Sequence, residues 1–358
     1  MLQALRRDHV VEPKPTSGPS PELRFGRQER VAEFGAEGQA ALSKACAAIV
    51  GLGALGSRVA EDLTRAGIGK LVLVDRDFVE LSNLHRQHLY DEEDAKEQRP
   101  KVLAAAQALG RIHVGTDLRI ELVDLRPENI EERLEGVDLL VDGTDNFQTR
   151  YMLNDYAKKS GIPWIYGACV GTQSMAAFFQ PQGPCLRCLF PEAPPISKTQ
   201  TCESAGVLPS AAAYTATLQL AWALRYLGTG TAPEGALFIG DLFETQFRNM
   251  GFPKTPSPTC PCCNEARFPA LDPSQATQAV PLCGRLAVQL QAPSGTRVDL
   301  QGLADKLEGD QLLQLFPFLL RARFPEGEIT VFEDGRAIVQ GTDDPARARA
   351  LFDRYLGS

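Results

Sequence analysis

Long apolar runs are missing from this sequence. No segment of its 358 residues approaches the roughly 18 consecutive apolar residues that a membrane-spanning helix needs, so we expect no membrane association. The first residues also lack the apolar core of an export signal. Residues 1–22, rich in Pro and Ser beyond Pro13, are typical of a flexible arm. We therefore expect a cytoplasmic protein.

An excess of basic residues is missing as well. The chain has 37 Lys and Arg against 45 Asp and Glu, a formal net charge of −8. Without a basic cluster, general binding to nucleic acid or to an anionic membrane is disfavoured, and we expect neither as a partner. A local basic patch that binds phosphate groups is still compatible with this balance.

Cysteine, in contrast, is plentiful, with nine residues. In a cytosolic chain such a count favours metal or redox chemistry over disulfides. Cys46 and Cys169 lie in expected buried strands and are assigned to the core, and Cys283 has no assignable role.

The order of expected elements indicates an α/β fold. Apolar strands alternate with helical segments as far as about Ala168, which predicts a Rossmann-like, doubly wound and mainly parallel sheet. A helix broken at Gly35 is expected over 23–45, and an apolar core helix over 210–228. We expect four parts: an arm over 1–22, a main domain over 23–268, a linker over 269–281 and a small α+β domain over 282–358.

The small domain has its own pattern. A strand is expected over 286–291, a helix over 300–309, a hairpin over 328–341 that turns at Asp334-Gly335, and a helix over 344–356 with Asp344 as its N-cap. The chain is too short there for a rhodanese domain and lacks its active-site cysteine loop, so no sulfur transfer is assigned to it. A docking role for this domain is an alternative.

A glycine loop follows the first strand. Gly51-Leu52-Gly53-Ala54-Leu55-Gly56 matches the GxGxxG nucleotide fingerprint in the strand-to-helix context that the motif requires. Glycines allow the backbone to approach a phosphate, and the next helix offers free N–H groups and a positive dipole end. Asp75 ends the following strand, where a carboxylate can accept hydrogen bonds from ribose hydroxyls. At this point NAD and ATP are equally allowed.

The segments after Asp75 distinguish the two nucleotides. They are SNLHRQ (82–87), QRPK ending at Lys101, and GTDN with Asp145. Arg86 and Lys101 are donors suited to a triphosphate, and Asp145 ends a strand where a carboxylate can hold Mg²⁺. Each residue alone has an ordinary structural explanation, such as a helix cap, but their ordered combination is much more specific.

Taken together, RFGRQ, GLGALG, LVDRDFVELSNLHRQ, QRPK and DGTDN resemble the successive motifs of the MoeB/ThiF-type adenylyltransferases. These enzymes activate ubiquitin-like sulfur carriers of molybdopterin and thiamine synthesis and are related to the ubiquitin-activating enzymes. The resemblance covers roughly Leu23 to Arg267. It departs at Ala54, where the family usually has a third glycine in the loop.

The resemblance implies ATP and Mg²⁺ as ligands, with Asp75 on the ribose, Asn83, Arg86 and Lys101 around the phosphates, and Asp145 on magnesium or on the attacking carboxylate. Arg27 matches a residue that reaches the neighbouring subunit's ATP, which implies a homodimer. The nucleotide-binding set expected from the motifs is Gly51, Gly53, Ala54, Gly56, Asp75, Ser82, Asn83, Leu84, His85, Arg86, Lys101, Asp145 and Asn146.

Two CxxC pairs, Cys185/Cys188 and Cys260/Cys263, predict a closed four-cysteine zinc site with a structural role. The resemblance places zinc here as well. Cys262 could compete as a ligand, and the choice of Cys263 rests on the CxxC spacing alone.

Cys202 stands apart, in TQTCESAGV of a Pro-rich loop. The segment resembles the family's mobile loop, whose cysteine in some members forms a thioester or persulfide link with the carrier. A reactive thiol needs an electropositive setting, and the sequence offers only Lys198 nearby.

The expected reaction is therefore adenylylation of a carrier's C-terminal Gly-Gly carboxylate, with sulfur supplied later by a donor protein or through Cys202. One alternative is a same-fold enzyme acting on a tRNA-linked or peptide carboxylate. Another is an NAD-dependent oxidoreductase with structural zinc, which is disfavoured because none of the four histidines has an obvious catalytic partner.

Overall fold

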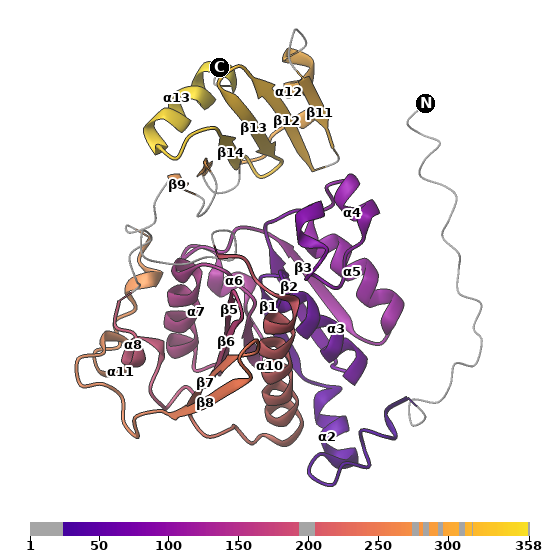
Figure 1. Cartoon of the computed structure of the whole chain (residues 1–358), viewed down its shortest axis with the longest axis vertical. Helices are drawn as coiled ribbons and strands as arrows, with labels where there is room; N and C mark the ends of the chain where they lie inside the picture. Colours follow the sequence, from indigo (N-terminus) through magenta and orange to yellow (C-terminus); the bar gives the residue numbers. More distant parts are fainter. Residues whose placement is uncertain are drawn as a thin grey trace.

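The computed structural model describes residues 24–192, 205–273, 279–281, 286–292, 296–307, 312–316 and 318–356. Two sheets organise this part of the chain, an eight-stranded sheet of order β3-β2-β1-β4-β5-β6-β7-β8 and a six-stranded sheet of order β11-β12-β13-β14-β10-β9 (Figure 1). The expected α/β fold with a second, smaller domain is confirmed.

The large sheet joins a parallel half to an antiparallel half. Strands β1 to β5 pair in parallel, and each of the next three pairs antiparallel with its predecessor. Every residue of β1 and β4 is buried, which explains why both strands are apolar except for Asp142 at the end of β4. The strands are β1 Cys46–Val50, β2 Lys70–Asp75, β3 Asp117–Leu122, β4 Leu139–Asp142, β5 Trp164–Val170, β6 Gln173–Phe179, β7 Ala236–Asp241 and β8 Gln246–Gly251.

Helices cover both faces of this sheet. One core cluster joins side chains of α3, α5 and α10, and a second, on alternate strand positions, joins those of α6 and α7. The helical segments are α2 Gly35–Leu42, α3 Gly56–Ala66, η1 Leu81–Asn83, α4 Glu92–Lys96, α5 Lys101–Ile112, α6 Ile130–Arg133, α7 Phe147–Ser160, α8 Leu186–Leu189, α10 Pro209–Thr229, α11 Pro261–Asn264 and η3 Pro269–Leu271. No helix among the described residues is long and apolar enough to cross a bilayer.

Two details of the main domain differ from expectation. The helix expected over 23–45 is reduced to α2, and the described residues before it form mainly turns. Strands β7 and β8 were not predicted. All six residues of β8 are exposed, so this edge strand has no apolar alternation from which to predict it.

The C-terminal domain, the described residues from Ala279 onward, has a separate core that includes Val288, Phe324, Val339 and Leu351. The predicted hairpin is confirmed, and Gly335 adopts φ 80° at its turn. The sheet begins with β9, inside the expected linker, and β11 and β12 were not predicted. The elements are β9 Ala279–Pro281, β10 Ala287–Leu290, α12 Leu300–Lys306, β11 Leu312–Leu315, β12 Leu319–Phe324, β13 Gly327–Phe332, β14 Ala337–Gln340 and α13 Pro345–Leu356.

Candidate nucleotide pocket and cysteine cluster

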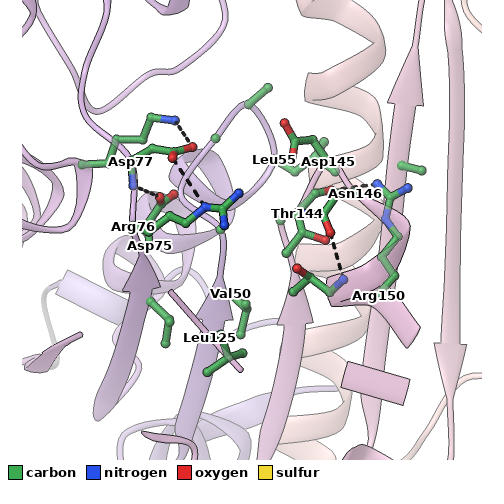
Figure 2. Close-up of a pocket in the computed structure, with 18 of the residues that line it drawn as sticks. Val50, Leu55, Asp75, Arg76, Asp77, Leu125, Thr144, Asp145, Asn146 and Arg150 are labelled. Atoms are coloured by element: carbon green, nitrogen blue, oxygen red, sulfur yellow. Dashed lines mark hydrogen bonds and ion pairs between the residues drawn. The ribbon is translucent and has the colours of Figure 1, made fainter. Parts of the chain in front are cut away.

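A cavity of about 290 Å³ lies at the carboxyl ends of the parallel strands. Its walls are the glycine loop, the segments that follow β2, β3 and β4, and residues of β5 (Figure 2). This is the edge at which open parallel sheets bind their ligands.

Close packing explains two of the loop glycines. Gly51 adopts φ +86°, and a Cβ there would lie 2.8 Å from the carbonyl carbon of Gly143. A Cβ on Gly56 would lie 1.8 Å from the Gly51 oxygen. At Gly53 the nearest atom would be 3.8 Å away, and this residue lines the cavity. Gly53 is therefore the cavity-lining glycine of the loop that close packing does not explain.

Asp75 is tied to the backbone on both carboxylate oxygens. Oδ2 accepts a hydrogen bond from the Leu52 N–H at 2.6 Å, and Oδ1 accepts one from the Asp77 N–H at 2.7 Å. Burial raises the pKa of Asp75, and the charge of Lys101 counteracts this effect. Each oxygen keeps an acceptor lone pair, so the residue fits ribose hydroxyls.

Two of the cations that line the cavity, Lys101 and Arg86, belong to the expected nucleotide-binding set. The Lys101 Nζ lies 3.5 Å from Asp77 Oδ2, and the side chain is nearly buried. Burial lowers the pKa of Lys101, but the carboxylates of Asp77 and Asp75 raise it more, so its pKa lies above the usual value and the amine is charged at neutral pH. Arg86 extends from the turn after η1, where its Nη1 donates to the Ser82 carbonyl at 2.9 Å.

The loop after β4 carries the acidic group. Asn146 is the N-cap of α7, since its Oδ1 accepts from the Thr149 N–H at 2.9 Å. Asp145 is exposed and lines the cavity, and no hydrogen bond within the described part of the chain engages its side chain. The Asp145 carboxylate is thus available to a ligand. Asp145 is not the cap of α7, so this structural role does not explain its presence. Arg150 fixes this loop by donating to the Thr144 carbonyl at 2.7 Å.

The structure brings together only part of the expected nucleotide-binding set. Gly51, Gly53, Ala54, Asp75, Arg86, Lys101, Asp145 and Asn146 line the cavity. Gly56, Ser82, Asn83, Leu84 and His85 do not. Asn83 instead forms a capping box with Glu80 at the start of η1. Ser82, Asn83, Leu84 and His85 belong to η1 and the turn that positions Arg86, and their direct contact with ATP stays a prediction.

Of the two remaining expected site residues, the structure describes Arg27 but not Cys202. Arg27 is exposed and does not line the cavity of its own chain, which is compatible with a reach to a partner subunit. Cys202, with Lys198 and Cys283, lies outside the described residues.

Sequence reasoning missed several residues of the cavity wall. Arg76 and Asp77 directly follow Asp75, and Asp124 follows β3, so the strand-end rule could have found all three. Arg150 had no such signal, because it lies inside α7, where an arginine is typical of a solvated helix face.

The two CxxC pairs meet in one cluster. Sγ of Cys185 lies 3.6 Å from that of Cys260, and Sγ of Cys188 lies 3.7 Å from that of Cys263. The four sulfurs lie within 4.8 Å of one another, and the Ser257 N–H points to Cys188 Sγ at 3.4 Å. A closed set of four thiols from two loops is the donor set and spacing of a structural zinc site.

Cys262 packs beside Cys185 but is not one of the four clustered sulfurs. Its thiol donates to Asp155 Oδ1 at 3.1 Å. The same buried carboxylate accepts from Arg187 at 2.7 and 2.9 Å, and Arg187 lies between the first two cluster cysteines. Asp155 thus ties both cysteine loops to α7, and the geometry favours Cys263 over Cys262 as the fourth ligand.

Comparison with known protein families identifies the family to which this chain belongs. The model of the ThiF family matches residues 25–262, which include the glycine loop, the cavity wall and three of the four cluster cysteines. The chain belongs to the ThiF family. The resemblance to MoeB/ThiF-type adenylyltransferases, expected from the motifs, is confirmed.

Curated relatives agree with this assignment. The chain is 39% identical over 336 residues to the sulfur carrier protein ThiS adenylyltransferase of Bacillus subtilis, a match of 93% of this chain and 99% of that protein. It is 39% identical over 249 residues to the sulfur carrier protein adenylyltransferase of Thermus thermophilus, covering 68% and 90% of the two chains. Among solved structures, Escherichia coli MccB with succinimide has a TM-score of 0.58 at 19% identity, over 67% of this chain and 74% of that chain. That likeness concerns the fold alone.

Proposed function

We propose that this ThiF-family chain adenylylates the C-terminal glycine carboxylate of a ubiquitin-like sulfur carrier protein. The observation that carries the proposal is the meeting of Lys101, Arg86 and Asp145 around one glycine-loop cavity. The names of the relatives from B. subtilis and T. thermophilus support this class of substrate.

In the proposed reaction, an oxygen of the carrier's carboxylate attacks the α-phosphorus of ATP. The new P–O bond forms as the bond to the β-phosphate oxygen breaks, so that the products are an acyl-adenylate and pyrophosphate. A carboxylate is already ionised and nucleophilic, so no general base is required. Catalysis then depends on positioning and on neutralising the charge that develops on the phosphates.

The residues of the cavity divide this work. Asp75 fits the ribose, and Gly53 gives the phosphates access to the backbone. Lys101, held by Asp77, and Arg86, held by its own turn, place two positive charges at the cavity wall. Asp145 would hold Mg²⁺, which supplies further charge neutralisation for the phosphates when bound.

The cysteine cluster would hold a structural zinc ion. Cys185, Cys188, Cys260 and Cys263 would supply all four ligands of a tetrahedral ion, so no coordination position would be left for a substrate. We infer that the metal joins the loop after β6 to the segment after β8, and that it takes no part in the chemistry.

Three further features belong to the proposal. Arg27 would complete the site of a partner subunit in a homodimer. Sulfur would then displace AMP from the acyl-adenylate, delivered by a donor protein or through Cys202. For Cys202, the expected result of Cys202→Ala is normal adenylate formation with impaired sulfur transfer, and full sulfur transfer would make the residue structural.

The test is the exchange of labelled pyrophosphate into ATP. We expect exchange only when a carrier ending in Gly-Gly is present, and no measurable binding of NAD. A tRNA and a short peptide serve as competing acceptors. Exchange with one of these alone would assign a different acceptor to the same fold, and saturable NAD binding without any exchange would contradict the proposal.

A further inference from the structure

The C-terminal domain contacts the main domain at the wall of the nucleotide cavity. In Figure 1 it lies beyond one end of the large sheet. Its polar contacts reach Arg76 and Asp124, two residues that line the cavity from the ends of β2 and β3. A domain with a separate core thus shares residues with the proposed active site.

Asp124 is the first of these shared residues. Its Oδ1 accepts from Arg76 Nη1 at 2.7 Å. Its Oδ2 accepts from the Nε2 atoms of Gln289 and Gln291, each at 3.1 Å. Gln289 is almost completely buried in β10, where an amide without a partner would be costly. Arg126 Nε of the main domain also lies 3.4 Å from Oδ2. The two glutamines thus share with Arg126 the fixing of the carboxylate that in turn fixes Arg76.

Arg336 makes a second contact on the same segment. This residue follows the β13–β14 turn, and its Nη2 donates to the Arg76 carbonyl at 2.7 Å. Its side chain is 3% exposed, and its guanidinium lies 4.0 Å from the ring centroid of Phe332. Phe332 stacks on Phe78, with ring centroids 5.0 Å apart. Aromatic and charged groups of the C-terminal domain thus hold residues on both sides of Asp77.

The segment held in this way carries the polar groups of the cavity. Figure 2 shows Asp75, Arg76 and Asp77 side by side at the end of one strand. Asp77 pairs with Lys101, and Phe78 forms a bridge with Pro100, the residue before Lys101. A buried polar group that loses a hydrogen-bond partner is costly, so such a network favours the arrangement that keeps its partners. Undocking of the C-terminal domain would remove both glutamine donors from Asp124, which would keep Arg76 and Arg126, and would remove the Arg336 donor from the Arg76 carbonyl. Docking and the shape of the cavity are therefore coupled.

We propose that the C-terminal domain is a positioning element of the nucleotide site, in which Gln289, Gln291 and Arg336 set the affinity for ATP through Asp124 and Arg76. The identity of the ligand as ATP rests on the proposed function above. Coupling between two sites is reciprocal, so bound ATP must also stabilise the docked domain.

Full-length variants test this proposal. Gln289→Met with Gln291→Met keeps side-chain length and removes both donors to Asp124, and Arg336→Leu removes the contact to Arg76. We expect each to weaken ATP binding by about 5- to 20-fold, within the usual range of coupling between sites, with turnover at saturating ATP unchanged. Arg336→Lys keeps one donor and should recover part of the loss.

Arg354→Ala is the matched control. Arg354 is exposed on α13 and pairs with Glu326 of the same domain, so its loss should leave ATP affinity as in wild type. Hydrogen exchange gives a second readout, since ATP should slow exchange of amides in 329–340 in wild type and less so in the glutamine double variant. Folded variants that bind ATP like wild type would overturn the proposal, as would a loss of turnover alone.

The two proposals fail in different ways. ATP binding is measured calorimetrically without any carrier, so it does not depend on the acceptor. A wild type that binds ATP but exchanges no pyrophosphate contradicts the proposed function and leaves the positioning role intact. Normal carrier-dependent exchange, with ATP affinity insensitive to Gln289, Gln291 and Arg336, contradicts the positioning role alone.

Discussion

The nucleotide cavity and the cysteine cluster lie in one domain, but their polar side chains are arranged differently: toward a cavity in the first and toward one another in the second. In the cavity, Lys101 and Asp145 line the space that a ligand would occupy, and Lys101 also pairs with the Asp77 carboxylate. In the cluster, the four thiols face one another. The cavity thus suits a ligand that binds and dissociates, and the cluster suits a metal ion that stays bound.

The difference lies in the backbone as much as in the side chains. Asp75, Asp124 and Asp145 stand at the ends of separate parallel strands, so the rigid sheet places them, and Lys101 begins α5. The cluster residues lie in two short helices, α8 and α11, and the segments beside them, joined to α7 through Asp155. We therefore expect changes in the cavity to affect turnover first, and changes in the cluster to affect stability first.

The largest expected effect is in the cluster. Cys185→Ser should remove bound zinc and lower the free energy of unfolding by several kcal/mol, because metal binding to such a site is coupled to folding. Elemental analysis of wild type should give about one zinc per chain, the content of a single site with four cysteine ligands. A wild-type protein without zinc, or a variant of unchanged stability, would contradict the structural role of the cluster.

The next effect is in the cavity. Lys101→Ala should reduce pyrophosphate exchange by about 10²- to 10³-fold, the scale for losing one preorganised charged donor. Lys70→Ala is the control, since Lys70 pairs with Asp117 at the surface and does not line the cavity. A Lys101 variant that folds and keeps wild-type turnover would show that the cavity is not where charge is neutralised.

A smaller loss is expected at Asp145. Asp145→Asn should reduce Mg²⁺-dependent turnover by about 10- to 100-fold, the size for losing one charged contact. Thermal stability should stay as in wild type, because Asn146 and not Asp145 caps α7. A fall in melting temperature with normal turnover would instead give Asp145 a structural role.

The smallest effect separates the neighbouring cysteines. Cys262→Ser keeps a donor for Asp155 and should cost about 1 kcal/mol of stability or less, with zinc content unchanged. The metal should be lost only from variants of the four cluster cysteines. Loss of zinc from the Cys262 variant would exchange the roles of Cys262 and Cys263.

Much of this arrangement could be predicted from the sequence. The buried strands read as apolar runs, and the polar residues at their ends mark one edge of the sheet by a general rule of parallel sheets. The Ala and Leu residues of α5, Lys101–Ile112, recur at helical spacing, so this helix also has a signal in the sequence. The CxxC spacing identified the four cluster cysteines because the residues of each pair lie on one tight turn.

The rest depends on contacts that no local pattern records. Asn83 belongs to a matched motif, yet its side chain accepts from the Glu80 N–H, because Glu80 caps η1 and the turn brings the two residues together. The pairing of Gln289 and Gln291 with Asp124 joins residues from two domains. Every residue of β8 is exposed, so its sequence has no alternation of apolar and polar residues from which to predict the strand or its pairing with β7.

The most direct measurement of the central claim is the intact mass of the carrier after incubation with this protein, ATP and Mg²⁺. We predict a carrier that has gained one adenylyl group on its C-terminal glycine, and none with the Lys101→Ala variant over the same time. A carrier of unchanged mass, from every Gly-Gly carrier tried and with ATP-loaded wild-type protein, would contradict the account.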